Sequence, residues 1–470
     1  MSTALHYLAS AALLVASISC ASATRTSPSG VVADDALMAR ARAVHRRVFT
    51  LDTHVDIDPE NFQAGALNYT QRLSTQVDLT KMEEGGIDAI FFSIYVGQGP
   101  LDAAGYAHAY DVDTAKFDAV HRLAEQLAPD RIAIAYTAAD ARRIHASGKK
   151  VAFMGVENGY GIGTDIRRVK EFYDRGGRYM SLAHNGNNQL SDSNTGEAAN
   201  DGLWGNGLSP LGRQVIVEMN RLGMMIDVSH PSKGSMMQTL ALTKAPIIAS
   251  HSGVRALCDN ARNLDDEELR ALGKNGGVVQ LVAYRGFVKC DAAYDATRAR
   301  ALASLDSTFG ISRGRRGGGG AAAARGPVAG MPGPMCGPDR GAPRSGESAS
   351  EEAQLAELTP ARRDEYQTRR RAIDERYPPR ADATVRDYVD HIDYAVKLIG
   401  IDHVGIASDF DGGGGLADYA CALQAVNITA ELLRRGYTEE QIGQIWSGNL
   451  LRVLDEVERV AKRIQSGAAS

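Results

Sequence analysis

The sequence predicts an eight-stranded β/α barrel, and three observations support that prediction. Eight short apolar segments are spaced along the chain, helical segments lie between them, and several of the apolar segments are almost continuously hydrophobic. A strand covered on both faces has this composition, and repeated strand-helix units favour a parallel sheet. Eight such units close naturally into a barrel. An open doubly wound sheet is the alternative fold, but no glycine-rich nucleotide turn follows the first apolar segment.

The expected strands and helices alternate in chain order. A leading helix is expected over 34–47, and four later helices over 166–174, 210–222, 265–274 and 383–398. Pro210 suits the first turn of its helix. After the last strand, 438–464 predicts one or two amphipathic helices. The expected strands are 48–57, 89–95, 151–157, 179–184, 224–230, 246–251, 277–284 and 404–410.

A chain of 470 residues, with 44% hydrophobic residues and a net charge of −5, can bury a large core and has no overall charge bias toward nucleic acid. We expect one barrel domain over 33–465, interrupted by a Gly/Arg-rich segment at 312–348. That segment has almost no large apolar residues, so it predicts a disordered loop. Its arginines would also suit an RNA-binding tail, although an exported protein seldom meets RNA. The charged stretch 358–376 predicts a helix in a lid or surface excursion.

The N-terminus predicts an export signal over 1–23. Its apolar centre at 8–18 is too short to span a bilayer, and small residues surround Ala23. No Lys or Arg precedes the apolar run, which is unusual for such a signal. Cys20 offers the alternative of lipid attachment, but the residues before it are poor for that. No later apolar run is long enough for a membrane helix. Together with the export signal, this predicts an exported protein that is periplasmic or secreted.

Six of the eight expected strands end on a metal ligand or proton carrier. Barrel enzymes place their catalytic groups at this end of the strands. In the first strand, residues two apart point to the same side, so His54 and Asp56 would project together. So many unpaired polar groups in one barrel mouth would be costly unless they converge on metal. The strand-end residues are His54, Asp56, Glu157, His184, His230, His251, Asp409 and Asp411, whereas His45, His108, His121, His145 and His391 lie in helical or loop contexts and receive no role.

Seven motifs occur in a fixed order: DTHVD, GVENG, AHN, DVSH, ASHSG, NARN followed by LDDEEL, and SDFDG. In these motifs the chain, from about residue 33 to 460, resembles the renal (membrane) dipeptidases, peptidase family M19, within the amidohydrolase-like barrels. The resemblance implies a zinc-dependent dipeptidase that cleaves free dipeptides with a metal-bridging hydroxide. It does not decide whether the enzyme accepts C-terminal D-residues or hydrolyses β-lactams. Dimers are common in the family, which makes a homodimer one expectation.

The resemblance also implies roles for individual residues. His54 and Asp56 would bind one zinc ion, His230 and His251 a second, and Glu157 would bridge the two. His184 would stabilise the oxyanion and Asp409 would carry the proton. Arg262 would bind the substrate carboxylate. The alternative interpretation is that Arg262 lies on the surface and pairs with Asp259 or Asp265. The physical chemistry agrees, because two metal ions make an activated water without a Ser or Cys nucleophile.

Two other functions remain as alternatives. A related barrel hydrolase acting on a lactone, phosphotriester or another amide would keep the fold, but such enzymes generally open with His-x-His. An exported metal- or peptide-binding protein would have no need of Asp409 as a proton carrier. The resemblance further implies a disulfide between Cys258 and Cys290, which the residues alone leave as two buried thiols or a bond. Cys336 and Cys421 are expected to be free.

Overall fold

The computed structural model describes residues 29–195, 197, 201–311, 336, 355, 357–378 and 380–467. The predicted export signal at 1–23 lies outside these residues. So does the predicted disordered loop at 312–348, apart from Cys336. In the part of the chain that is described, no helix is both long and apolar enough to cross a membrane.

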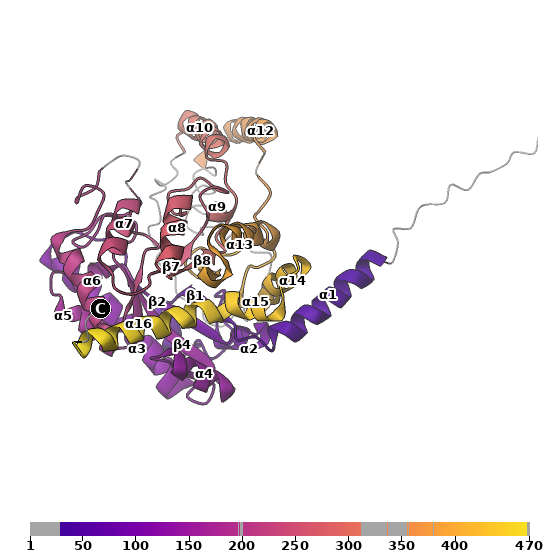
Figure 1. Cartoon of the computed structure of the whole chain (residues 1–470). Coiled ribbons are helices and arrows are strands. Elements are labelled where there is room, and N and C mark those ends of the chain that lie inside the picture. The colour runs from indigo at the N-terminus through magenta and orange to yellow at the C-terminus, as the bar shows by residue number, and fades with distance from the viewer. Residues whose placement is uncertain are drawn as a thin grey trace, which may run out of the picture.

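Parallel strands form a ring, which confirms the predicted (β/α)8 barrel (Figure 1). Each strand pairs in parallel with the next in the ring. The last strand returns to the first through a bridge between Val55 and Phe410, where the Asp56 N–H donates to the Phe410 carbonyl at 2.9 Å. The ring strands are β1 (Leu51–Asp56), β2 (Ala89–Tyr95), β4 (Lys150–Glu157), β5 (Gly177–Ser181), β6 (Met225–Asp227), β7 (Ile248–Ser252), β8 (Val278–Val282) and β9 (Val404–Ala407).

All eight predicted strands are present, but several end earlier than predicted. His184 and His230, expected to close their strands, lie in the loops just beyond β5 and β6. One strand was missed: β3 (Ile132–Ile134) pairs with the start of β4, outside the ring. A three-residue strand carries too little periodicity to be recognised from sequence.

Helices surround the ring, and those predicted agree with the structure within a few residues. The helices are α1 (Ser29–His45), α2 (Leu79–Gly85), α3 (Ala103–Arg122), α4 (Ala138–Ala146), α5 (Arg167–Asp174), α6 (Pro210–Leu222), α7 (Lys233–Leu242), α8 (Asp266–Lys274), α9 (Arg285–Val288), α10 (Ala292–Phe309), α12 (Pro360–Arg376), α13 (Val385–Ile399), α14 (Val426–Arg434), α15 (Glu439–Gly443) and α16 (Asn449–Gln465). Local signals set their ends. In α6, the Ser209 side chain accepts the Gly212 N–H, Pro210 begins the helix, and Gly223 at φ 87° ends it.

Helix α16 closes the end of the barrel where the strands begin. Its buried side chains, including Leu450, Leu454 and Val457, belong to one apolar cluster with Leu51 and Val278 at the starts of β1 and β8. Figure 1 shows α16 as a long yellow helix that runs across the molecule. The site must therefore open at the other end, where the strands terminate.

An insertion between β8 and β9 stands apart from the barrel. Helices α10 and α12 lie side by side in Figure 1 and share a small apolar cluster that includes Phe309 and Tyr366. The predicted charged helix at 358–376 is thus confirmed as α12. Its excursion from the barrel agrees with the prediction of a surface excursion.

The cysteine predictions were half right. Cys258 and Cys290 form the predicted disulfide. Cys336 and Cys421 were expected to be free, and that expectation was wrong: they are joined, with Cα atoms 5.9 Å apart. The path of a Gly/Arg-rich segment is not fixed by local pattern, so the sequence could not reveal that Cys336 meets the loop beyond β9.

Candidate metal centre

The carboxylate of Glu157, the last residue of β4, is the centre around which the predicted ligands gather. Its Oε2 lies 3.1 Å from His54 Nε2. Its Oε1 lies 3.1 Å from His230 Nε2 and 3.4 Å from the Nε2 atoms of His184 and His251. The two oxygens therefore face different imidazoles, Oε2 one and Oε1 three. All of these side chains are buried.

The first strand contributes two groups from one side, as its period-two geometry requires. His54 Nε2 lies 3.6 Å from Asp56 Oδ2. Asp409 joins them from the loop after the neighbouring strand β9, and ligand atoms of His54, Asp56 and Asp409 lie within 4.8 Å of one another. The groups His54–Glu157–His251 and Glu157–His184–His230 meet the same spacing. The predicted metal-site residues are thus brought together in one place.

The donor set fits a metal cation. His54 Nε2 is buried and has no hydrogen-bond partner among the described residues, although it lies close to Glu157. His230 Nε2 and His251 Nε2 lie 3.1 Å apart, so at least one of them points a lone pair at the other. Imidazole nitrogens and carboxylate oxygens converging in this way are the ligands that zinc takes in proteins. A cation between them would satisfy the orphaned nitrogen and separate the two rings.

Burial and charge shift the pKa values of these groups in opposite directions. Burial lowers the pKa of His184 to about 4 and holds those of His230 and His251 well below the usual value. Burial would raise the pKa of Glu157, but the imidazoles of His54 and His184 bring it well below its ordinary value. Burial thus favours neutral rings at His184, His230 and His251, the state that metal ligation needs. At His54 burial would also lower the pKa, but Tyr179 and Glu157 outweigh it and raise this pKa well above its usual value.

Asp409 follows β9 in a strained backbone conformation. Its φ is 57°, in the left-handed region, and its N–H donates to the His54 carbonyl at 3.1 Å. Burial, opposed by His54 and reinforced by Asp56, raises the pKa of Asp409 to about 8. Gly412 packs against this carboxylate and that of Asp56, and a Cβ at Gly412 would overlap both. The turn therefore holds two carboxyl groups together at the mouth.

Asp411, the other strand-end aspartate, turns away from this centre. Its carboxylate accepts the backbone N–H groups of Gln76 at 2.7 Å and of Val77 at 3.2 Å. It thereby fastens the loop after β1 to the loop after β9. Of the strand-end residues, Asp411 is the one whose contacts are structural.

Arg262 reaches the same centre from the loop after β7. Its Nη2 lies 3.1 Å from both His230 Nε2 and the His251 carbonyl oxygen, and the residue is 8% exposed. Its Nη1 is buried without a hydrogen-bond partner in the described chain. Burial lowers the pKa of this guanidinium to about 10. The alternative of a surface Arg is wrong, since Asp265 pairs instead with Lys233 at 2.7 Å.

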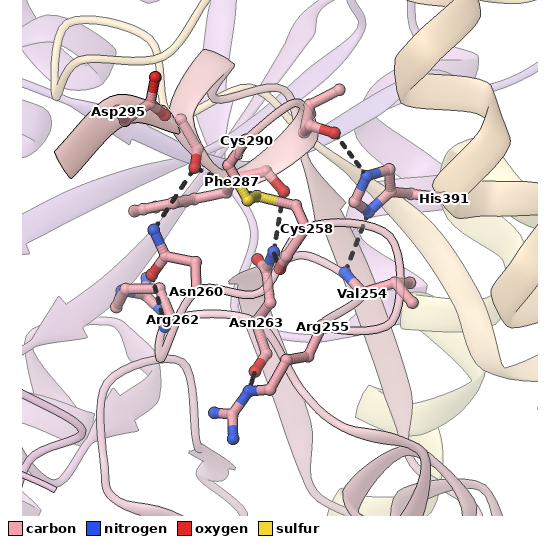
Figure 2. The surroundings of a disulfide bond; sticks show 12 residues. Val254, Arg255, Cys258, Asn260, Arg262, Asn263, Phe287, Cys290, Asp295 and His391 are labelled. Atoms are coloured by element: carbon pink, nitrogen blue, oxygen red, sulfur yellow. Dashed lines mark hydrogen bonds between the residues drawn. A yellow bond between two sulfur atoms is a disulfide. The ribbon is translucent and has the colours of Figure 1, made fainter. Parts of the chain in front are cut away.

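The predicted disulfide anchors the loop that carries Arg262 (Figure 2). The Asn263 side chain donates to the carbonyls of Cys258 at 2.9 Å and Phe287 at 2.8 Å. The Arg262 N–H donates to the Asn260 side chain at 2.9 Å. These contacts tie the loop to the segment after β8. The guanidinium therefore projects from a cross-linked support.

Five histidines were given no role, and none of them belongs to the metal-spaced groups of the described residues. His45 bonds to Thr429 at 2.8 Å, and His391 accepts the Val254 N–H at 3.0 Å, as satisfied structural histidines do. His121 pairs with Glu125 at 2.7 Å, and His145 stacks on Phe49. His108 lies on α3, away from the strand ends.

Sequence reasoning missed several residues that touch the centre. Tyr95 ends β2 and packs its ring 4.6 Å from that of His184, so the strand-end rule would have found it had tyrosine been counted. Tyr179 lies 3.0 Å from His54 Nδ1, and Ser250 lies 2.8 Å from His251 Nδ1. Both are in strand interiors, where no pattern distinguishes them from structural polar residues.

Comparison with known proteins gives matches over most of the chain. The family model for membrane dipeptidase (peptidase family M19) matches residues 38–468. Dipeptidase tcpJ of Claviceps purpurea (strain 20.1) is 30% identical over 401 residues, which cover 83% of this chain and 72% of tcpJ. The crystal structure of the probable dipeptidase PvdM from Pseudomonas aeruginosa is similar with a TM-score of 0.69 and 29% identity, covering 91% of this chain and all of that one.

A third match shows the fold alone. It is a metallo peptidase from Rhodobacter sphaeroides, liganded with a phosphinate mimic of the dipeptide L-Ala-D-Ala. Its TM-score is 0.59 and its identity 20%, with 87% of this chain and 99% of that chain covered.

Proposed function

Because this chain belongs to the membrane dipeptidase family, peptidase family M19, we propose that it is a zinc-dependent dipeptidase that hydrolyses free dipeptides. The observation that carries the proposal is the placement of Glu157, whose Oε2 faces His54 and whose Oε1 faces His184, His230 and His251. Such a carboxylate can give one oxygen to each of two metal ions.

We assign His54 and Asp56 to one zinc ion and His230 and His251 to the other, with Glu157 shared by both. When bound, two such ions would acidify a water molecule and polarise the scissile carbonyl of the substrate. The chain supplies the rest of the chemistry. None of its assigned residues acts as a covalent nucleophile.

His184 is proposed to donate a hydrogen bond to the oxygen on which charge develops. Its Nε2 lies 3.4 Å from Glu157 Oε1, and its ring packs against the rings of Tyr95 and His230, with centroids 4.6 Å and 4.0 Å away. A donor fixed in this way does not have to reorganise as the charge appears. We propose that Asp409, across the mouth, takes the proton from the attacking water and passes it to the leaving amine.

Arg262 is proposed to bind the carboxylate at the C-terminal end of the substrate. A buried guanidinium with an unsatisfied Nη1 suits a bidentate ligand that enters from solution. The carboxyl groups of Asp56 and Asp409 favour a positively charged amino group at the other end. The site would thus select molecules with opposite charges two residues apart.

The test combines metal analysis with a substrate panel. The purified protein should contain two zinc ions per chain and should cleave L-Ala-L-Ala. It should not cleave the C-terminal amide of that dipeptide with comparable efficiency. L-Ala-D-Ala belongs in the panel, because the Rhodobacter relative was liganded with a mimic of that dipeptide. A protein without bound metal, or one that cleaves dipeptide and amide equally well, would contradict the proposal.

We also propose that residues 1–23 direct export of the protein. The Cys258–Cys290 disulfide supports this, since such bonds persist in oxidising compartments. N-terminal sequencing of the protein from a fractionated producing cell should find the mature chain beginning near residue 24, outside the cytoplasm. An uncleaved chain in the cytoplasm would contradict export, and a lipid on Cys20 would favour the lipoprotein alternative.

A further inference from the structure

Each of the three histidines assigned to metal binding has a partner on its second ring nitrogen. His54 Nδ1 lies 3.0 Å from the Tyr179 hydroxyl, and His251 Nδ1 lies 2.8 Å from the Ser250 hydroxyl. His230 Nδ1 lies 3.2 Å from the Asn185 side-chain oxygen. An imidazole can offer a lone pair at Nε2 only if Nδ1 carries the proton, so these partners must act as acceptors.

The protons of the two hydroxyl groups are committed elsewhere, which fixes the direction of both hydrogen bonds. The Tyr179 hydroxyl donates to the Thr53 carbonyl at 3.2 Å. The Ser250 hydroxyl donates to Asp227 Oδ2 at 2.6 Å. A hydroxyl has one proton, so each is left to accept from its histidine.

The surroundings hold both hydroxyl groups in place. Asp227 Oδ1 accepts the N–H groups of Ser250 at 2.8 Å and Ser229 at 3.1 Å, so this carboxylate is fixed by β7 and by the loop after β6. The Tyr179 ring fits against Gly155 of β4, where a Cβ would overlap the ring. It also stacks on Phe91, with centroids 5.1 Å apart. Neither hydroxyl can turn away without breaking buried contacts.

We propose that Tyr179 and Ser250 are positioning residues, which fix His54 and His251 as the tautomers with Nδ1 protonated and Nε2 free for metal. This inference rests on the proposed metal-dependent function. It assigns the hydroxyl groups no contact with the substrate. The orphaned His54 Nε2 agrees with it, because that nitrogen makes no hydrogen bond in the described chain even with Glu157 nearby.

The test is the zinc affinity of Tyr179→Phe, measured by competition with a chromophoric chelator. This variant keeps the ring and removes only the hydroxyl. One of the two zinc ions should bind about 10- to 100-fold more weakly, the usual effect of losing an outer partner of a ligating histidine. Ser250→Ala should weaken the other zinc ion by a similar factor.

Matched controls separate positioning from general loss of stability. Tyr388 is also buried, and its hydroxyl donates to the Leu281 carbonyl at 2.7 Å without touching a proposed ligand. Ser252 is buried on the same strand as Ser250, and its hydroxyl contacts Ser229. Tyr388→Phe and Ser252→Ala should lower the thermal stability of the metal-free protein while leaving zinc affinity unchanged.

A second readout keeps the inference testable if a variant is unstable. In zinc-free wild-type protein labelled with ¹⁵N-histidine, His54 and His251 should both show a protonated Nδ1, and His251 should show an unprotonated Nε2. Zinc affinities of Tyr179→Phe and Ser250→Ala equal to those of their controls would overturn the inference, as would the opposite tautomers. If wild-type protein binds no zinc at all, the proposed function fails instead.

Discussion

Replacing Glu157 by Gln would test the shared-ligand arrangement directly, because the change keeps the shape of the side chain and removes its charge. Oε2 faces His54 at 3.1 Å and accepts the Ser93 hydroxyl at 3.0 Å, while Oε1 faces His230 at 3.1 Å. In the amide, one of these positions becomes an NH₂ group that has no lone pair for a metal. The other keeps an oxygen without a charge. Both zinc sites are therefore weakened by one substitution.

The size of the effect follows from this geometry. Loss of an outer partner of a ligand typically costs 10- to 100-fold in metal affinity. Loss of a direct ligand should cost at least as much as the upper end, about 100-fold for each zinc ion. That factor corresponds to about 2.8 kcal/mol per site, at about 1.4 kcal/mol for each tenfold change. The zinc-dependent rise in melting temperature should shrink accordingly.

Metal content after dialysis, chelator competition and dipeptide hydrolysis would be measured together. Glu268→Gln is the matched control, because Glu268 is also a buried Glu but serves α8, accepting the Asp265 N–H at 2.8 Å. This control should keep two zinc ions and activity. If Glu157→Gln kept both ions with unchanged affinity, or lost one while the other bound as in wild type, the shared role of Glu157 would be refuted.

Three further predictions concern the substrate end of the site and the cross-links around it. Arg262→Ala should lower kcat/KM for free dipeptides about 10- to 100-fold, the value of a charged hydrogen-bonded contact, while leaving metal content and the slow cleavage of dipeptide amides alone; equal losses on both substrates would contradict carboxylate binding. Replacing Cys258 and Cys290 by Ser opens a loop of 32 residues, which should lower the free energy of unfolding by about 4 kcal/mol and raise KM, as checked by urea denaturation and kinetics. Deleting 312–348 together with Cys421→Ser should leave dipeptide turnover essentially unchanged relative to Cys421→Ser alone, because a segment of this composition supplies no rigid ligand; a collapse in turnover with the fold intact would assign the segment a functional role.

Much of this arrangement can be predicted from the sequence because the C-terminal ends of all barrel strands lie together. Residues that follow the expected strands are therefore predicted to share one site. Glu157 and His251 are far apart in the chain, but each lies in the last two residues of a parallel strand, and all such strand ends meet at one mouth. Strand boundaries need to be right only within a few residues for this to work. His184 and His230 fall just outside their strands, and their Nε2 atoms still lie within 3.4 Å of Glu157.

The residues that hold the ligands could not be found in this way, for a physical reason. Tyr179 lies in the middle of β5, 125 positions from His54, and its hydroxyl reaches Nδ1 because Gly155 leaves room for the ring on β4. That contact depends on the packing of three strands at once, and none of the three segments carries a pattern that specifies it. A polar residue inside a buried strand predicts only that some partner exists, because an unpaired polar group there is costly. The burial of Tyr179 and Ser250 therefore predicts that each hydroxyl has a hydrogen-bond partner. Only the closed barrel determines that these partners are His54 and His251, whose Nε2 atoms converge on Glu157.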